Sequence, residues 1–278
     1  MTDTDLPIKA KFSIDLQQML DIMFVGARRT SAFLRLGLDN LDTSTPEDFV
    51  LGKGNLYSFW PENLADKDKA HAKEEYSAWL TGSCLKELDH YFALFLDDVW
   101  FKCELAELHN KLVPSHLVVG DRKFQADTNV ASKLKKISER IGCDTHAEAF
   151  SSLSLARNCL THGMGKVRNR DLNSEDSLRI SWLAIHAYVD DGKKEISLNK
   201  SFEKNETLYF PNGGNLFVRI EEFSHAFKIG EKIAISLQQI AEICWFYIHQ
   251  ATKVHAAMLT YLQDKGIKRS NGEGESAV

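Results

Sequence analysis

The chain has 278 residues, 44% of them hydrophobic and 26% charged, with a formal net charge of −5. This is an ordinary globular composition, which excludes a disordered chain. The acidic balance also argues against a protein that coats nucleic acid through its overall field, so any contact with RNA is expected to be local.

No targeting or metal-binding pattern stands out along the chain. The opening MTDTD lacks the basic and apolar parts of a signal peptide, and no apolar run approaches the length of a membrane span. We therefore expect a cytoplasmic protein without membrane contact. The five cysteines include no CxxC pair, which argues against a disulfide framework or a structural zinc site. Reduced thiols, no metal and no cofactor are predicted.

The first 62 residues are expected to be an N-terminal helical segment and a long connection. Apolar residues at helical spacing from Ile14 to Leu38 predict one or two helices, with Gly26 as a weak point. Residues 39–62 contain two prolines and two glycines without a sustained period. They predict a connection rather than a regular element.

A long helical tract is predicted from Leu64 to Leu112, divided or bent at Gly82-Ser83. The Asp97-Asp98 pair is expected on a solvated face, because neighbouring helical residues point about 100° apart and cannot form a metal site alone. A further helix fits Asn129 to Arg140. Its outer face is expected to carry Lys133, Lys135 and Lys136, either as a solvated face or as a guide for RNA.

The stretch from Thr145 to Val167 combines helix signals with the densest chemistry of the chain. Thr145 and Glu148 predict a capping box at its start. Gly163 and Gly165 can adopt positive φ, so the helix should end near His162. The apolar face predicted for this helix consists of Phe150, Leu153, Ala156 and Leu160.

The last turns of this helix carry Arg157, Asn158 and His162. Arginine grips phosphate oxygens bidentately, and histidine can pass protons near neutrality, so the pair suits phosphoryl chemistry. Five helical residues separate the arginine and the histidine by roughly 140° around the axis, so one helix cannot aim both at one phosphate. A complete site is most easily built if a second copy of the helix adds its own pair across a two-fold axis.

A bare Arg-to-His spacing carries little weight by itself, because it recurs along the chain. Only one instance has a polar residue directly after the arginine and lies in a predicted helix that ends at glycine, namely the one that starts at Arg157. The four instances are Arg140 to His146, Arg157 to His162, Arg179 to His186 and Arg219 to His225.

The string ARNCLTHGMGKV resembles the motif helix of HEPN domains (higher eukaryotes and prokaryotes nucleotide-binding), whose signature is Arg, a polar residue, three variable residues, then His. The resemblance implies an α-helical bundle that dimerises through this helix. It also implies a metal-independent endoribonuclease of a toxin, antiphage or RNA-processing system. Arg157 and His162 would be the catalytic pair and Asn158 the polar helper.

Basic residues and strand signals follow the motif. Lys166, Arg168 and Arg170 are candidate RNA-binding residues for the flanking phosphates, although an exposed polar loop explains them equally well. An antiparallel β insertion is expected at about 178–230. Its predicted segments are Leu178–Val189, Lys194–Leu198, Thr207–Phe210 and Leu216–Ile220, with a hairpin turn at Asp191-Gly192.

A long C-terminal helix should start at Ser236, where Gln239 completes a capping box. Residues 266–278 lack apolar content and are expected to be a disordered tail. The fold class predicted is therefore mainly α, with a HEPN-like helical bundle over 63–265 that carries the β insertion.

Two functions remain open at this point. The first is an endoribonuclease in which the RNA 2′-hydroxyl attacks the adjacent phosphorus at a composite dimer site. The second is an inactive HEPN-like dimeric module that binds RNA, a nucleotide or a protein partner. A toxin restrained by an antitoxin partner is a third, weaker hypothesis; toxicity on expression that vanishes in Arg157→Ala would support it.

Overall fold

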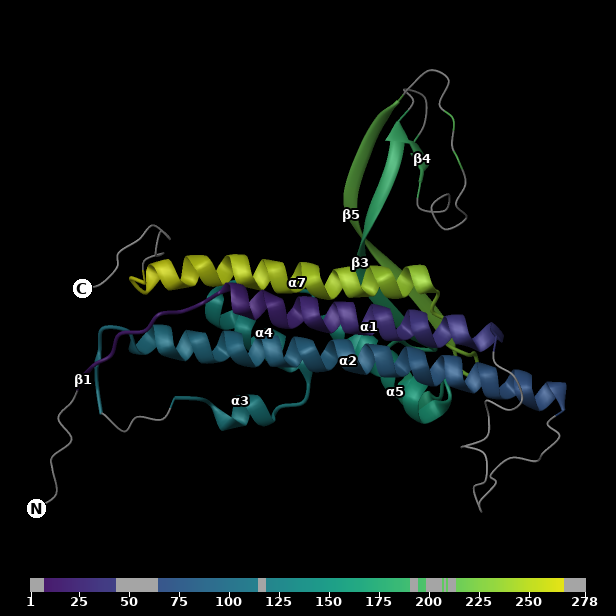
Figure 1. The fold of residues 1–278 in the computed structure, drawn as a ribbon, viewed down its shortest axis with the longest axis horizontal. Coiled ribbons are helices and arrows are strands. Elements are labelled where there is room, and N and C mark those ends of the chain that lie inside the picture. The colour runs from purple at the N-terminus through teal and green to yellow at the C-terminus, as the bar shows by residue number, and fades with distance from the viewer. Residues whose placement is uncertain are drawn as a thin grey trace, which may run out of the picture. The chain divides into compact units, whose positions relative to one another are not determined.

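A computed structural model describes residues 8–43, 65–114, 119–190, 195–198, 207, 209 and 214–267. The described part is mainly α-helical, with one antiparallel sheet of three strands and a second of two short strands (Figure 1). The helices are α1 (Gln17–Thr43), α2 (Asp66–Leu108), α3 (Arg122–Ala126), α4 (Val130–Ile141), α5 (Ala147–Gly163) and α7 (Leu237–Asp264), with a 3-10 turn at Asn169–Asp171. The strands are β1 (Ile8–Lys9), β2 (Leu112–Val113), β3 (Ser177–Asp190), β4 (Glu195–Ser197) and β5 (Asn215–Lys228). None of the helices in these ranges is both long enough and apolar enough to cross a membrane.

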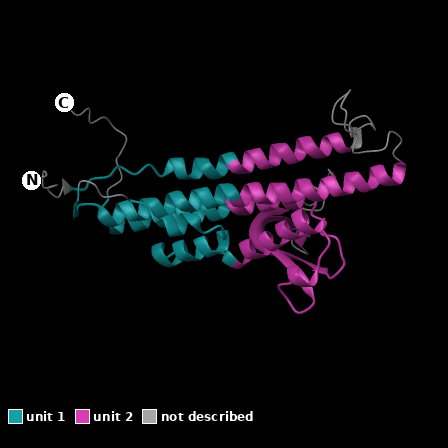
Figure 2. Cartoon of the chain, turned by 90° about the horizontal axis from the view of Figure 1, so that it is seen from below, with its two compact units in different colours: residues 1–25, 90–147, 248–278 teal, residues 26–89, 148–247 magenta. Residues whose placement is uncertain are grey.

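The chain divides into two compact units, which Figure 2 shows in different colours. The first unit contains residues 1–25, 90–147 and 248–278, and the second contains residues 26–89 and 148–247. The long helices α1, α2 and α7 therefore each contribute residues to both units. The predicted boundary between residues 62 and 63 lies outside the described residues.

The first unit buries apolar side chains of α2, α4 and α7. Its fully buried residues include Phe92, Phe95, Leu96, Val99, Leu134, Ile137, Val254 and Met258. At its edge, the rings of Trp100 and Phe124 stack with centroids 4.2 Å apart, and the guanidinium of Arg140 lies 4.1 Å from the Trp100 ring. This unit thus combines an apolar core with an aromatic stack that a guanidinium contacts.

The second unit contains α5, the three-stranded sheet and the first turns of α7. The sheet has the order β4-β3-β5, and β3 pairs with β5 antiparallel from Ser177 opposite Lys228 to Asp190 opposite Asn215 (Figure 1). The backbone N–H of Ser181 in β3 donates to Oγ of Ser152 in α5 at 3.0 Å. The helix that carries the motif is therefore fixed to the sheet by a hydrogen bond.

The helix predicted near the N-terminus forms as α1. It is continuous through Gly26 and is not divided there. Gly26 is buried and lies between the buried residues Met23 and Ala27. A glycine at a packed position keeps the helix intact, because tertiary contacts outweigh its low helix propensity. The predicted connection at 39–62 is helical up to Thr43, and the rest of it lies outside the described residues.

The Gly82-Ser83 pair does not divide the long tract either, since α2 runs uninterrupted through it. A Cβ at Gly82 would lie 2.9 Å from Cγ2 of Thr161 and 3.0 Å from Cβ of Leu160. The glycine therefore permits α2 to approach the motif helix closely. The tract ends at Leu108, earlier than predicted, because Asn110 takes a left-handed φ of 61° that asparagine tolerates.

We expect Gly82→Ala to destabilise the protein by about 1–3 kcal/mol, because the added methyl group overlaps atoms of α5. Ser83→Ala, one residue along the same helix, is the matched control and should change stability far less. Chemical denaturation of both variants measures the difference. Equal stability of the two variants would contradict the close packing at Gly82.

One lysine of α4 is not on the outer face predicted for it. Lys133 is only 2% exposed, and its ammonium group donates to Oδ1 of Asp97 at 2.7 Å. The prediction that Asp97 is merely solvated is therefore also wrong, and Asp98 pairs with Lys102. The side chain of Lys133 is long enough to carry its charge through the packed layer to a carboxylate, so burial is offset by pairing.

The C-terminal predictions are largely confirmed. The capping box forms as expected, because the N–H of Ser236 donates to Oε1 of Gln239 at 2.8 Å and the N–H of Gln239 donates to Oγ of Ser236 at 3.2 Å. Three of the four predicted β segments correspond to β3, β4 and a longer β5, whereas Thr207 and Tyr209, the described residues of the fourth, lie in no strand. The hairpin at Asp191-Gly192, most of Thr207–Phe210 and most of the predicted tail lie outside the described residues.

Candidate functional site

The motif helix α5 buries the face that its sequence predicts. Phe150, Leu153, Ala156 and Leu160 are all at most 3% exposed. The Phe150 ring lies 4.9 Å from the ring of Phe246 and 4.8 Å from that of Tyr247. The helix starts at Ala147, so Thr145 does not take the capping position predicted for it.

The end of α5 agrees with the prediction. The helix ends at Gly163, directly after His162. Met164 and Gly165 then adopt positive φ angles of 51° and 73°, and the N–H of Gly165 donates to the carbonyl oxygen of Cys159 at 3.1 Å. This left-handed exit turns the chain sharply and leaves the last helical turn, with His162, at the surface.

Arg157 is held by a buried carboxylate of α2. Its Nη1 donates to Oδ2 of Asp89 at 2.7 Å, with the arginine side chain 25% exposed and the aspartate side chain 6% exposed. Asp89 also accepts from the hydroxyl of Tyr247 at 2.6 Å and from Oγ of Ser154 at 3.2 Å. Three elements of the second unit, α2, α5 and α7, thus converge on one carboxyl group.

The charges of this network follow from its burial. Burial raises the pKa of the Asp89 carboxyl, while the hydrogen bonds from Tyr247, Arg157 and Ser154 oppose that rise. Burial and the neighbouring Asp89 also raise the pKa of the Tyr247 hydroxyl, so it remains a donor. Arg157 supplies the cation that lies beside this almost entirely buried carboxyl group.

Asn158 contacts the arginine and not the histidine. Its Oδ1 accepts from Nε of Arg157 at 3.2 Å and from Nη2 at 3.0 Å. The guanidinium is therefore held from two sides, by Asp89 and by Asn158. A planar group fixed in this way has a defined orientation, which favours the recognition of a phosphate.

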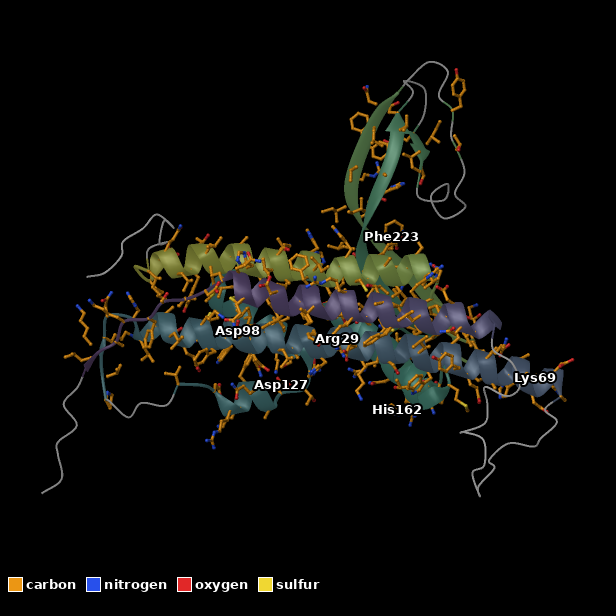
Figure 3. The ribbon with its side chains drawn as sticks, in the orientation of Figure 1. Arg29, Lys69, Asp98, Asp127, His162 and Phe223 are labelled. Carbon is orange, nitrogen blue, oxygen red and sulfur yellow. The ribbon has the colours of Figure 1, made fainter. Side chains whose placement is uncertain are left out.

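His162 is exposed on the last turn of α5, as the label in Figure 3 shows. No hydrogen bond or ion pair joins its imidazole to another residue within the described ranges. The side chain is thus accessible to a substrate. The structure places Arg157, Asn158 and His162 in the same two turns, with only the first two in contact.

The three basic residues after the helix differ in their surroundings. Lys166 is exposed. Arg168 is half-buried, and its Nε lies 3.4 Å from Oδ2 of Asp171, which also accepts from the backbone N–H of Arg168 at 2.9 Å. Arg170 is 66% exposed and lies 3.9 Å from the same carboxylate. The predicted phosphate contacts are therefore most accessible at Lys166 and Arg170.

Among the residues described, no three His, Cys, Asp or Glu side chains are grouped as a metal ion would require. The five cysteines are free and buried. The thiols of Cys84 and Cys159 illustrate the effect of this burial, which raises their pKa to about 11.

Comparisons with family models, with curated proteins and with solved structures gave no match.

The residue that the sequence did not reveal is Asp89. It lies in the apolar stripe of α2, between the buried residues Leu88 and Phe92. An aspartate on a buried face needs a partner, and this is the signal that could have indicated a link to a basic residue elsewhere. Nothing in the local sequence indicates that the partner is Arg157, which follows 68 residues later.

Proposed function

We propose that this protein is a metal-independent endoribonuclease whose site is shared between two copies of α5. The observation that carries the proposal is a surface turn with a guanidinium fixed by Asp89 and Asn158 and an exposed imidazole at His162. The resemblance of this turn to the HEPN motif supports the same assignment. The proposal extends to a homodimer, because a single helix cannot aim Arg157 and His162 at one phosphate.

In this mechanism the 2′-hydroxyl of RNA attacks the adjacent phosphorus, forming the O2′–P bond and breaking the P–O5′ bond. His162 of one copy takes the proton from the 2′-hydroxyl, and His162 of the second copy gives a proton to the departing O5′. Arg157 neutralises the charge that builds on the non-bridging phosphoryl oxygens. The products are a 2′,3′-cyclic phosphate end and a free 5′-hydroxyl end.

The position of Arg157 suits this role because its orientation is set before substrate arrives. A charged donor that needs no reorganisation stabilises a developing charge better than a mobile one. Asp89 neutralises part of the guanidinium charge, but the arginine side chain remains 25% exposed. Asp89 acts here as a positioning residue.

We expect purified protein to cleave mixed RNA in excess EDTA and to leave DNA of the same sequence intact, because DNA lacks the nucleophile. Mass spectrometry of the products should show cyclic phosphate ends. Cleavage that requires an added divalent ion, or that also acts on DNA, would exclude this mechanism.

One observation favours a second function, a binding module in which the motif is structural. Arg157 has an intrachain partner in Asp89, so its presence is explained by folding alone. In that case the protein would bind RNA, a nucleotide or a protein partner as a stable dimer and would form no product. Binding of RNA in the same EDTA buffer without cleavage selects this function.

A further inference from the structure

A cavity of about 650 Å³ opens beside the C-terminal end of α5. Its walls come from residues 71–81 of α2, from residues 160–166 and from residues 232–239, all within the second unit. Cavities of this size hold small organic ligands in many proteins. Gly163, which follows His162 directly, belongs to its lining.

Two lysines line this cavity from opposite segments of backbone. Lys166 and Lys232 pair as an antiparallel bridge. Like charges directly opposite each other are unfavourable unless an anion lies nearby. The ammonium of Lys232 lies 2.5 Å from Oε2 of Glu74, which compensates one of the two charges. The backbone N–H of Lys166 donates to the carbonyl oxygen of Gly163, but its ammonium group has no hydrogen-bond or ion-pair partner among the described residues.

The other acidic residue of the lining lies beside a histidine. Glu75 lies 3.3 Å from Nε2 of His71, on the neighbouring turn of α2. That imidazole compensates the carboxylate only when it is protonated, whereas Lys166 is the lysine of the lining whose ammonium has no ion-pair partner among the described residues. An anionic ligand would supply the missing partner, and a phosphate group matches a single ammonium of this kind.

The remaining wall is mostly apolar. It is formed by Leu160, Met164, Ile233, Ala234 and Ile235. Met164 keeps 66% of its surface exposed while its backbone holds the left-handed φ of 51°, which is uncommon for a residue other than glycine. An apolar surface next to a cation suits a ligand with a flat apolar body and a phosphate, which describes a nucleotide.

We propose that this cavity binds one ribonucleotide of the RNA substrate, adjacent to the cleaved phosphate, and so determines which sequence is cut. The base lies against the apolar wall and its phosphate contacts Lys166. This inference rests on the proposed function. The nucleotide is placed next to the cleaved phosphate because Gly163, which lines the cavity, directly follows the proposed catalytic residue His162. The ligand class follows from the cavity alone.

The test uses the full-length His162→Ala protein, so that binding is measured without cleavage. Isothermal titration with the four ribonucleoside 3′-monophosphates should show at least one that binds more tightly than inorganic phosphate. Lys166→Ala should weaken that binding by roughly tenfold to a hundredfold, the effect of losing a charged hydrogen bond. Ala234→Trp should remove the preference for the nucleotide over phosphate, because the indole occupies the space beside the apolar wall where the base would lie.

Lys67→Ala and Ala226→Trp are the matched controls, since both positions are exposed and neither lines the cavity. They should leave nucleotide binding unchanged. Circular dichroism establishes that each variant is folded. Nucleotides that bind no better than phosphate, or binding that neither cavity variant alters, would overturn the inference.

An RNA cleavage assay distinguishes failure of this inference from failure of the proposed function. In the protein with His162 intact, Ala234→Trp should redistribute the positions at which RNA is cut. Cleavage with unchanged positions and no nucleotide binding would reject the cavity and keep the nuclease. Nucleotide binding that depends on Lys166 without cleavage would reject the nuclease and keep the site. Mononucleotide binding that an RNA oligonucleotide does not displace would identify a free nucleotide as the ligand and overturn the assignment to RNA.

Discussion

Replacing His162 with alanine is expected to lower the rate of RNA cleavage by roughly 10²- to 10⁴-fold, the usual contribution of a general acid or base. The same substitution should leave the melting temperature unchanged, because the imidazole is exposed and bonds to no other described residue. A loss of rate without a loss of stability would assign the effect to chemistry.

His90→Ala is the control for this experiment. His90 is also exposed on a helix, yet it lies outside the motif. We expect its removal to leave both rate and stability unchanged. Single-turnover cleavage of a defined RNA, with thermal denaturation of the same samples, measures both quantities. Equal rates for the two variants would remove His162 from the mechanism.

The second large effect is expected at Asp89 and Arg157. Arg157→Ala leaves the Asp89 carboxyl buried without its cation, which should cost about 3–5 kcal/mol of stability. Asp89→Ala should be destabilising for the complementary reason, because it frees Arg157 and removes the acceptor of Tyr247. Either variant alone would lose activity partly through unfolding, so neither alone establishes catalysis.

A double variant separates the two roles. Asp89→Leu combined with Arg157→Met replaces the ion pair by apolar groups of similar volume, and such replacements are often neutral or stabilising. We expect the double variant to recover the stability that the unpaired charge costs, but not the part lost because the buried hydroxyl of Tyr247 has no acceptor, and to remain inactive on RNA. Urea denaturation and the cleavage assay together decide this. Recovery of activity along with stability would show that Arg157 is structural.

The pH dependence of Arg157→Ala has a definite sign. Burial raises the pKa of Asp89, and loss of the guanidinium should raise it further. A carboxyl group with a raised pKa in the folded state binds its proton more tightly there than in the unfolded state. The loss of folding stability that it causes is therefore largest at neutral pH, where the group is ionised. The stability difference between wild type and variant should therefore shrink as the pH falls from the pKa of the carboxyl in the folded variant to its pKa in the folded wild type, which is also raised but less so.

The local features of the site could be predicted from the sequence. The apolar spacing of α5 and its exit at Gly163 depend on residues a few positions apart, as does the capping box at Ser236. Such signals act within one or two helical turns. For the same reason the position of His162 at the end of the helix could be predicted.

The long-range pairs could not be predicted. Lys133 meets Asp97 across 36 residues, and Arg157 meets Asp89 across 68. Which carboxylate a buried cation meets depends on how helices pack, and periodicity gives the face of a helix but not its neighbour. Gly82 shows the same limit, because its role is a close contact with α5 and not a break in α2.

The central claim is that two copies of the chain share one centre, and a mixed dimer tests it most directly. Wild-type and His162→Ala chains with different tags can be co-expressed and the mixed dimer isolated by tandem purification. If each cleavage needs an imidazole from both copies, the mixed dimer will have far less than half the activity of the wild-type dimer. Activity at half the wild-type value, or full activity from a wild-type chain that remains monomeric, would contradict the account.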